Sequence, residues 1–243
     1  MDRHARTFLA ATAIFMPLLL LSDRSGLFAQ LLLGLATAGF VWLFARGSGV
    51  EPRQILCAIV VATIGECVLS LGWGLYSYRH ALIPLYVPPG HGLFYLLAAV
   101  SARQQLFRNR EVSITRGVLI SGSLIALVSL MLFRDSWGLL WWIGALLLIR
   151  RSENRLLLSA CFVYTMILEW LGTAIGNWQW AAVVPYVGLH SANPPAGVGI
   201  LYILLDLITV ALSSRLFAAR QERASPRPPI TVMTIVPDRA AAE

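Results

Sequence analysis

The sequence predicts an all-α fold, a polytopic bundle of helices that spans a membrane. Of its 243 residues, 58% are hydrophobic and only 13% are charged, and the mean hydropathy is +0.71. This composition is too apolar for a soluble domain of that length. Long apolar runs, bounded by charged residues, also recur along the chain, and a helix needs roughly 17 to 25 apolar residues to cross a bilayer.

Eight such runs predict about eight transmembrane helices. In chain order they cover about 7–22, 27–45, 54–74, 88–102, 117–133, 136–149, 156–176 and 196–214. The fourth and sixth are short, closer to the length of a buried or re-entrant helix. The first is expected to be a retained helix, because no small-x-small cleavage site follows it. The transmembrane domain then covers 1–218, and the polar, Pro-rich segment 219–243 is expected to be a disordered cytoplasmic tail.

The arginines predict the orientation of these helices. All 19 basic residues are Arg, and with eight spans all but Arg24, Arg79 and Arg134 fall on one side. Positive charge accumulates on the cytoplasmic side, so both termini are expected in the cytoplasm and the protein in the cell (inner) membrane. A nucleic-acid partner is not expected, because the basic residues follow the topology and form no groove-reading surface.

One pattern occurs twice, about a hundred residues apart. The first copy is Glu66-x7-Gly74-x-Tyr76-x-Tyr78, followed by Pro88-Pro89-x2-Gly92-x2-Tyr95. The second copy is Glu169-x6-Gly176-x-Trp178-x-Trp180, followed by Pro194-Pro195-x3-Gly199-x2-Tyr202. The duplication predicts two four-helix halves, about 1–110 and 111–218. An even number of helices per half makes the repeats parallel, related by an axis along the membrane normal.

Three acids inside apolar runs, Glu66, Glu169 and Asp206, are the candidate catalytic residues. An ionisable group at membrane depth is costly and is a functional-site hypothesis by default. A carboxyl group kept from water can hold its proton near neutral pH and act as a general acid. Because Asp206 has no counterpart in the first half, the second half is expected to carry the chemistry. The alternative is that the acids only fasten helices through hydrogen bonds.

Aromatic and polar residues of both copies are expected near the acids as a substrate-binding set. If the chain is extended at the Gly-x-aromatic-x-aromatic sites, the aromatic side chains lie on one side and suit the headgroup level of the membrane. The asparagines are expected as neutral hydrogen-bond partners of the acids, and the histidines as possible proton shuttles or solvated loop residues. The set is Tyr76, Tyr78, His91, Tyr95, Asn177, Trp178, Trp180, His190, Asn193 and Tyr202.

No cofactor and no metal ion are expected. The chain has no His-x3-His cluster of the di-iron type, and Cys57, Cys67 and Cys161 lack Cys-x2-Cys spacing. It has no Gly-rich phosphate loop and no nucleophile elbow around a serine. A retinal Schiff base is excluded because the chain contains no lysine.

The segment Glu169-Trp170-Leu171-Gly172-Thr173-x2-Gly176-x-Trp178-x-Trp180 resembles a signature of membrane proteins of the bacterioruberin-type carotenoid hydratase group. The resemblance implies a multi-helix enzyme that adds water to a terminal isoprenoid double bond, with Glu169 protonating the alkene or activating water. The chain departs from that signature in two ways: Asn177-Trp178-Gln179-Trp180 replaces a Phe-Gly-x-Tyr run, and the motif occurs twice.

Two main functions fit these observations. The first is an intramembrane protein that binds or modifies a long apolar isoprenoid or lipid whose polar end meets the acids, with hydratase-like proton chemistry if it is an enzyme. The second is a small proton-coupled transporter, because parallel repeats with an acid in each half suit alternating access. The third, an accessory subunit of the membrane without chemistry of its own, also remains open. The expected partners are the bilayer and an apolar small-molecule or lipid ligand.

Overall fold

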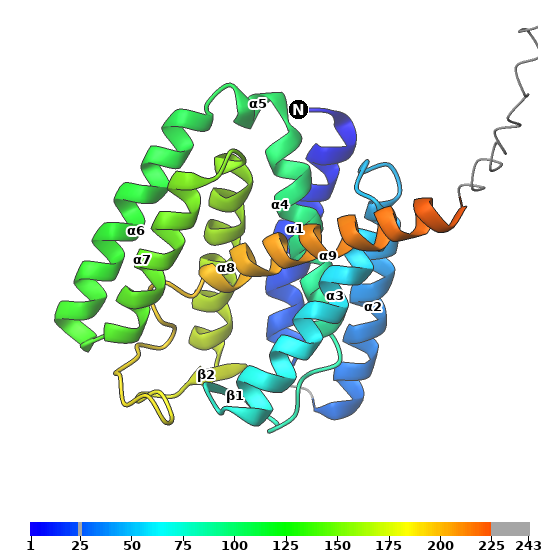
Figure 1. Cartoon of the computed structure of the whole chain (residues 1–243). Helices are drawn as coiled ribbons and strands as arrows, with labels where there is room; N and C mark the ends of the chain where they lie inside the picture. Colours follow the sequence, from blue (N-terminus) through cyan, green and yellow to red (C-terminus); the bar gives the residue numbers. More distant parts are fainter. Residues whose placement is uncertain (24–25, 225–243) are drawn as a thin grey trace, which may run out of the picture.

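The protein is a bundle of helices closed at one end by a small β-ribbon (Figure 1). The structure, a computed structural model, describes residues 1–23 and 26–224. The prediction of an essentially all-α fold is confirmed. Its elements are α1 (Arg3–Ser22), α2 (Leu27–Ala45), α3 (Pro52–Glu66), a π-helical segment η2 (Cys67–Gly72), β1 (Tyr76–Tyr78), α4 (Val87–Arg103), α5 (Gln105–Arg108), α6 (Glu111–Phe133), α7 (Ser136–Arg151), α8 (Arg155–Ile175), β2 (Trp178–Trp180) and α9 (Ile200–Ala224).

Five helices of the described chain are long and apolar enough to cross a membrane: α1, α2, α3 with η2, α6 and α8. The helices α4 and α7, with 17 and 16 residues, are as short as their apolar runs predict. In Figure 1, α9 runs across the other helices instead of alongside them. The structure therefore supports five candidate membrane spans. The eight transmembrane helices and the two parallel repeats stay predictions.

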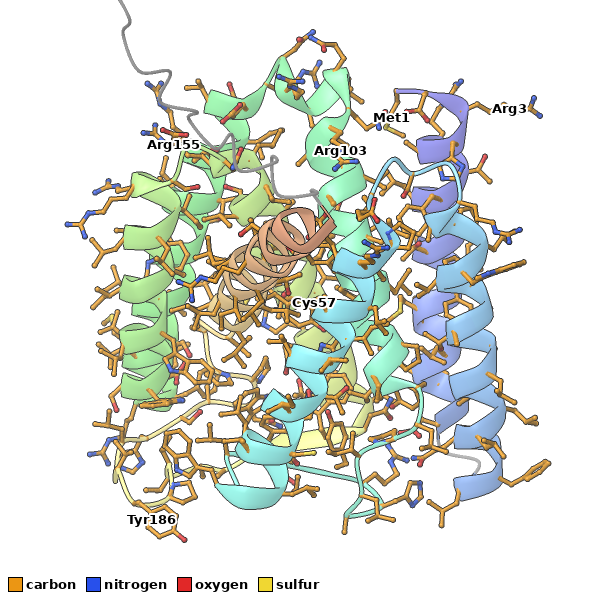
Figure 2. The ribbon with its side chains drawn as sticks, turned by 45° about the vertical axis from the view of Figure 1, so that its right-hand side comes forward. Met1, Arg3, Cys57, Arg103, Arg155 and Tyr186 are labelled. Atoms are coloured by element: carbon orange, nitrogen blue, oxygen red, sulfur yellow. The ribbon has the colours of Figure 1, made fainter. Side chains whose placement is uncertain are left out.

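The outer surface of the bundle is apolar, as expected of a protein surrounded by lipid. Large hydrophobic side chains such as Met131, Leu132 and Phe28 are 81%, 69% and 74% exposed. The two ends differ: Figure 2 shows Arg3, Arg103 and Arg155 at one end and Tyr186 at the other. Many large apolar side chains exposed on long apolar helices are what a membrane protein presents to lipid.

The core is built around α4. Nearly all of its residues from His91 to Ser101 are buried, and the helix packs against α2, α3 and α8. Because α4 is enclosed on most sides by protein, its short length does not expose its polar residues to lipid. On one side of it, α3 also packs against α9. The result is a space enclosed by α3, α4, α8 and α9.

The segment before α9 folds back against α7, so the last helix begins at Ile200 and not at 196 as expected. The buried carboxylate of Asp135 holds this segment: Oδ1 accepts from the backbone N–H of Ala192 at 3.0 Å, and Oδ2 accepts from that of Ala196 at 2.8 Å. Glycines allow the close approach. A Cβ added at Gly197 would lie 2.2 Å from the backbone nitrogen of Trp142.

The last helix extends into the first residues of the segment expected to be a tail. Residues 219–224 continue α9 as helix, because Ala, Arg, Gln and Glu are all good helix formers. The remainder of the expected tail, 225–243, lies outside the described residues.

Replacing Gly197 with Ala is expected to destabilise the protein by about 1–3 kcal/mol, because its methyl group would overlap the backbone of α7. The matched control is Gly39→Ala in α2, where an added Cβ meets nothing within 4 Å. That substitution should be neutral or raise stability by up to about 1 kcal/mol. Thermal unfolding of the detergent-solubilised proteins measures both. Equal midpoints for the two variants would contradict the close packing at residue 197.

Candidate ligand cavity

The two repeated motifs meet in the β-ribbon. Strands β1 and β2 pair antiparallel, with Tyr76 opposite Trp180, Ser77 opposite Gln179 and Tyr78 opposite Trp178. Because side chains alternate along a strand, all four aromatic residues point to one face and Ser77 and Gln179 to the other. The aromatic face is buried. The expectation that these rings lie on one side of the chain is met by the pairing, and their position at the headgroup level stays a prediction.

Glu66, the last residue of α3, receives hydrogen bonds on both carboxylate oxygens. The hydroxyl groups of Tyr76 and Tyr78 each donate to Oε2 at 2.7 Å, and Oε1 lies 3.0 Å from His91 Nε2. Burial raises the pKa of both tyrosines well above the usual range, and the charge of Glu66 raises it further. Both phenols therefore keep their protons and remain donors. Beyond Glu66 the helix changes to the π-helical η2, a feature often found at functional sites.

Glu169 in α8 has the matching arrangement in the second copy, with one difference. The indole N–H groups of Trp178 and Trp180 donate to its Oε2 at 2.8 and 2.9 Å. An indole nitrogen can only donate, so Oε2 must be an acceptor in both bonds. Within the described part of the chain, Oε1 receives no hydrogen bond. Glu169 therefore has an oxygen left for a ligand, whereas both oxygens of Glu66 are already used.

A hydrogen-bonded chain connects Glu66 to the last helix. His91 Nε2 lies 3.0 Å from Glu66 Oε1, and its other ring nitrogen, Nδ1, lies 2.6 Å from the hydroxyl of Tyr202. When the imidazole is neutral and donates to Glu66, Nδ1 must accept, and Tyr202 donates its proton to it. This order fixes the orientation of the His91 ring and leaves the lone pairs of the Tyr202 oxygen free.

These groups line a cavity of about 460 Å³, within the size range of sites for small molecules. Apart from them its walls are mostly apolar, and they come from α1, α3, η2, α4, α8 and α9. Four lining residues, Ile64, Val68, Leu204 and Ile208, are between 39% and 60% exposed. They belong to α3, η2 and α9, which indicates that the cavity opens there toward the lipid-facing surface.

Eight of the residues predicted from the sequence line this cavity, and the others lie elsewhere. The eight are Glu66, Tyr76, Tyr78, His91, Glu169, Trp178, Trp180 and Tyr202. Asp206 is buried outside the cavity, within electrostatic reach of Tyr95 and Cys161. The charged neighbour of Glu169 is Glu66. The two acids that were expected to approach one another, Glu66 and Glu169, line one cavity, and Asp206, which was expected to join them, does not.

The two asparagines do not contact the acids. The amide of Asn177 donates to the backbone oxygen of Leu20 at 2.8 Å, and its oxygen accepts from Arg79. Asn193 accepts from the backbone N–H of Trp180 at 2.9 Å and so anchors β2. His190 is exposed in the loop after β2. Asn193 thus holds the backbone of β2 and Asn177 that of α1, and residue type alone does not reveal either role.

Some residues of the site were missed from the sequence. Tyr86 and Phe94 line the cavity, and Phe94 could have been found because it lies three residues after His91 on the same face of α4. Arg79 donates to the backbone oxygens of Ile175 and Gly176 at 2.8 and 3.1 Å. A cation there is favourable at the carboxyl end of α8. Only the folded ribbon brings it to that position.

The described residues contain no group of three or more His, Cys, Asp or Glu side chains placed to hold a metal ion. Comparison of the chain with known protein families, with characterised proteins and with solved structures gives no match. Inference about function therefore rests on the cavity itself, and the resemblance around Glu169 stays a prediction.

Proposed function

We propose that this membrane protein binds a long apolar molecule, an isoprenoid or another lipid, and modifies it by proton transfer at its polar end. The observation that carries the proposal is the cavity: mostly apolar walls, with the uncommitted Oε1 of Glu169 at the end closed by the ribbon. An apolar pocket with a few convergent polar groups is typical of a ligand site. A buried acid in such a pocket is a candidate proton donor.

The opening of the cavity supports entry from the bilayer. The exposed lining residues at its mouth are Ile64, Val68, Leu204 and Ile208, all apolar. A chain dissolved in lipid can pass between α3 and α9 without crossing water, so its hydrocarbon keeps an apolar environment throughout. A water-soluble substrate would gain nothing from this route.

The reaction class that suits these groups is hydration of an isoprenoid double bond, as the resemblance around Glu169 implies. In the forward direction the carboxylic acid of Glu169 gives its proton to one alkene carbon. The oxygen of a water molecule bonds to the other carbon, and the water's surplus proton passes to the Tyr202 oxygen while Tyr202 gives its own to His91. Glu169 is left as carboxylate and His91 as imidazolium. Proton transfer between them restores the starting state.

A proton-coupled transporter is the second candidate, and one observation favours it. Each acid accepts two aromatic donors from its own copy of the motif, and the two copies pair through the ribbon. Such matching suits two parallel repeats that rock against each other. Proteoliposomes separate the candidates, because a transporter would accumulate ligand in response to a pH gradient and an enzyme would not.

We also propose that the arginine-rich end of the bundle, with both termini, faces the cytoplasm of the cell. In a background without Cys57, Cys67 and Cys161, a cysteine at Tyr186 should react with an impermeant thiol reagent added to intact cells. A cysteine at Arg110 should react only after permeabilisation. Both positions are exposed, so accessibility is decided by the membrane. The reverse labelling pattern would contradict this orientation.

Replacing Glu169 with Gln is expected to reduce turnover by a factor of about 10² or more, because the carboxamide has no transferable proton. Its oxygen can still accept from Trp178 and Trp180, so thermal stability should change little. Replacing Glu169 with Leu leaves two buried N–H groups unpaired and should cost about 1–3 kcal/mol of stability. Unfolding scans and mass spectra of the lipids that co-purify with each variant measure these effects.

The control is Glu153→Gln, which changes an exposed carboxylate outside the cavity and should leave the lipid profile as in the wild type. A wild-type profile and turnover in the Glu169→Gln variant would show that this residue only fastens the ribbon to α8. The accessory-subunit interpretation would then replace the enzyme. An absence of any isoprenoid or lipid enriched with the wild-type protein would contradict ligand binding itself.

A further inference from the structure

We infer that the polar end of the ligand is an uncharged hydroxyl group, which donates its hydrogen bond to the Tyr202 oxygen, and that the cavity rejects phosphorylated isoprenoids. This inference rests on the proposed function and specifies the class of its alcohol product, whose hydroxyl oxygen takes the place of the added water. It follows from the charges and from the hydrogen-bond donors that line the cavity.

The charges of the cavity wall exclude an anionic headgroup. Its ionisable side chains include the two carboxyls of Glu66 and Glu169, and among the described residues that line it none is an arginine. Its one histidine, His91, is already paired with Glu66. A phosphate in this space would be a buried anion beside carboxyl groups without a counter-charge on the cavity wall, which is strongly unfavourable. Polyprenyl phosphates are therefore poor candidates, although they are equally apolar.

The donors beside the two acids are already used, and the hydroxyl of Tyr86, which also lines the cavity, interacts with Asp23 instead. The hydroxyls of Tyr76 and Tyr78 donate to Glu66, and the indoles of Trp178 and Trp180 donate to Glu169. What remains for a ligand beside the acids is the Tyr202 oxygen, which accepts, and Glu169 Oε1, which donates when it carries the proton. A hydroxyl group satisfies both, and an ether does not.

Tyr202 is the stronger acceptor because of the chain behind it. Its proton is directed to His91 Nδ1 at 2.6 Å, and His91 is in turn oriented by Glu66 at 3.0 Å. Consecutive hydrogen bonds polarise one another, so a phenol that donates also accepts more strongly. Tyr202 also lies within electrostatic reach of Glu169. A hydroxyl between them can donate to Tyr202 and accept the proton of a protonated Glu169, which no ether or hydrocarbon can do.

The test compares three probes with the same chain: geranylgeraniol, its methyl ether and geranylgeranyl phosphate. Binding to the purified full-length protein is measured by competition with radiolabelled geranylgeraniol in detergent. Wild-type protein is expected to bind the alcohol about 10-fold more tightly than the ether, the effect of one hydrogen bond. The phosphate should bind more weakly still. Tyr202→Phe should reduce the affinity for the alcohol to that for the ether and leave the ether unchanged.

The matched control is Tyr164→Phe, which removes a hydroxyl bonded to Ser101 at 2.7 Å outside the cavity and should preserve the preference. His91→Gln breaks the chain at its middle and should lower the preference as Tyr202→Phe does, which guards against a folding defect of one variant. Phosphate binding as tight as that of the alcohol, or a preserved preference in Tyr202→Phe, would overturn the inference and leave ligand binding intact. Failure of all three probes to bind would instead overturn the proposed function, and this inference with it.

Discussion

The structure depends on the pairing of two three-residue strands that lie about a hundred residues apart in the chain. Strand pairing sets Tyr76 against Trp180 and Tyr78 against Trp178, so that four aromatic donors face one side. Two carboxylates at the ends of long apolar helices accept from them, Glu66 from the tyrosines and Glu169 from the tryptophans. A buried carboxylate without such donors would be expensive in this environment. The ribbon therefore lowers the free-energy cost of keeping both carboxylates away from water. It also links α3 to α8.

The ribbon gives each acid two aromatic donors, but the two acids differ in their remaining oxygen. Glu66 has a third partner, His91, and so both of its oxygens are used. Glu169 has no third partner in the described chain, and its second oxygen is left beside the cavity. The His91 ring, oriented by Glu66, accepts the hydrogen bond of Tyr202. Tyr202 lies in α9, the helix that runs across the bundle. In the function that we propose, Glu66 orients the acceptor Tyr202 through His91, and Glu169 is the proton donor.

Much of this arrangement could be predicted from the sequence, and the limits are physical. Composition and apolar runs predict a helical membrane protein, and the repeated Glu, aromatic and Pro-Pro pattern identified eight residues that line the cavity. The course of α9 could not be predicted, because its direction is set by the folded segment before it, held by Asp135 and by glycines that allow close contact. For the same reason the sequence wrongly suggested that Asp206, which lies on α9, would join Glu66 and Glu169 in the cavity. A helix that runs across the bundle carries its residues to neighbours that spacing along the chain does not reveal.

Photo-crosslinking tests most directly whether the cavity between α3, α4, α8 and α9 holds a neutral apolar ligand. The probe is a long isoprenoid alcohol with a diazirine in its chain, used on the protein in lipid nanodiscs, and the labelled peptides are mapped by mass spectrometry. The expected adducts lie on the cavity residues of α3 and α9, such as Ile64, Leu204 and Ile208, and excess unlabelled alcohol should remove them. Labelling spread over the outer faces of α2 and α6, with no competition by the alcohol, would contradict the cavity as the ligand site.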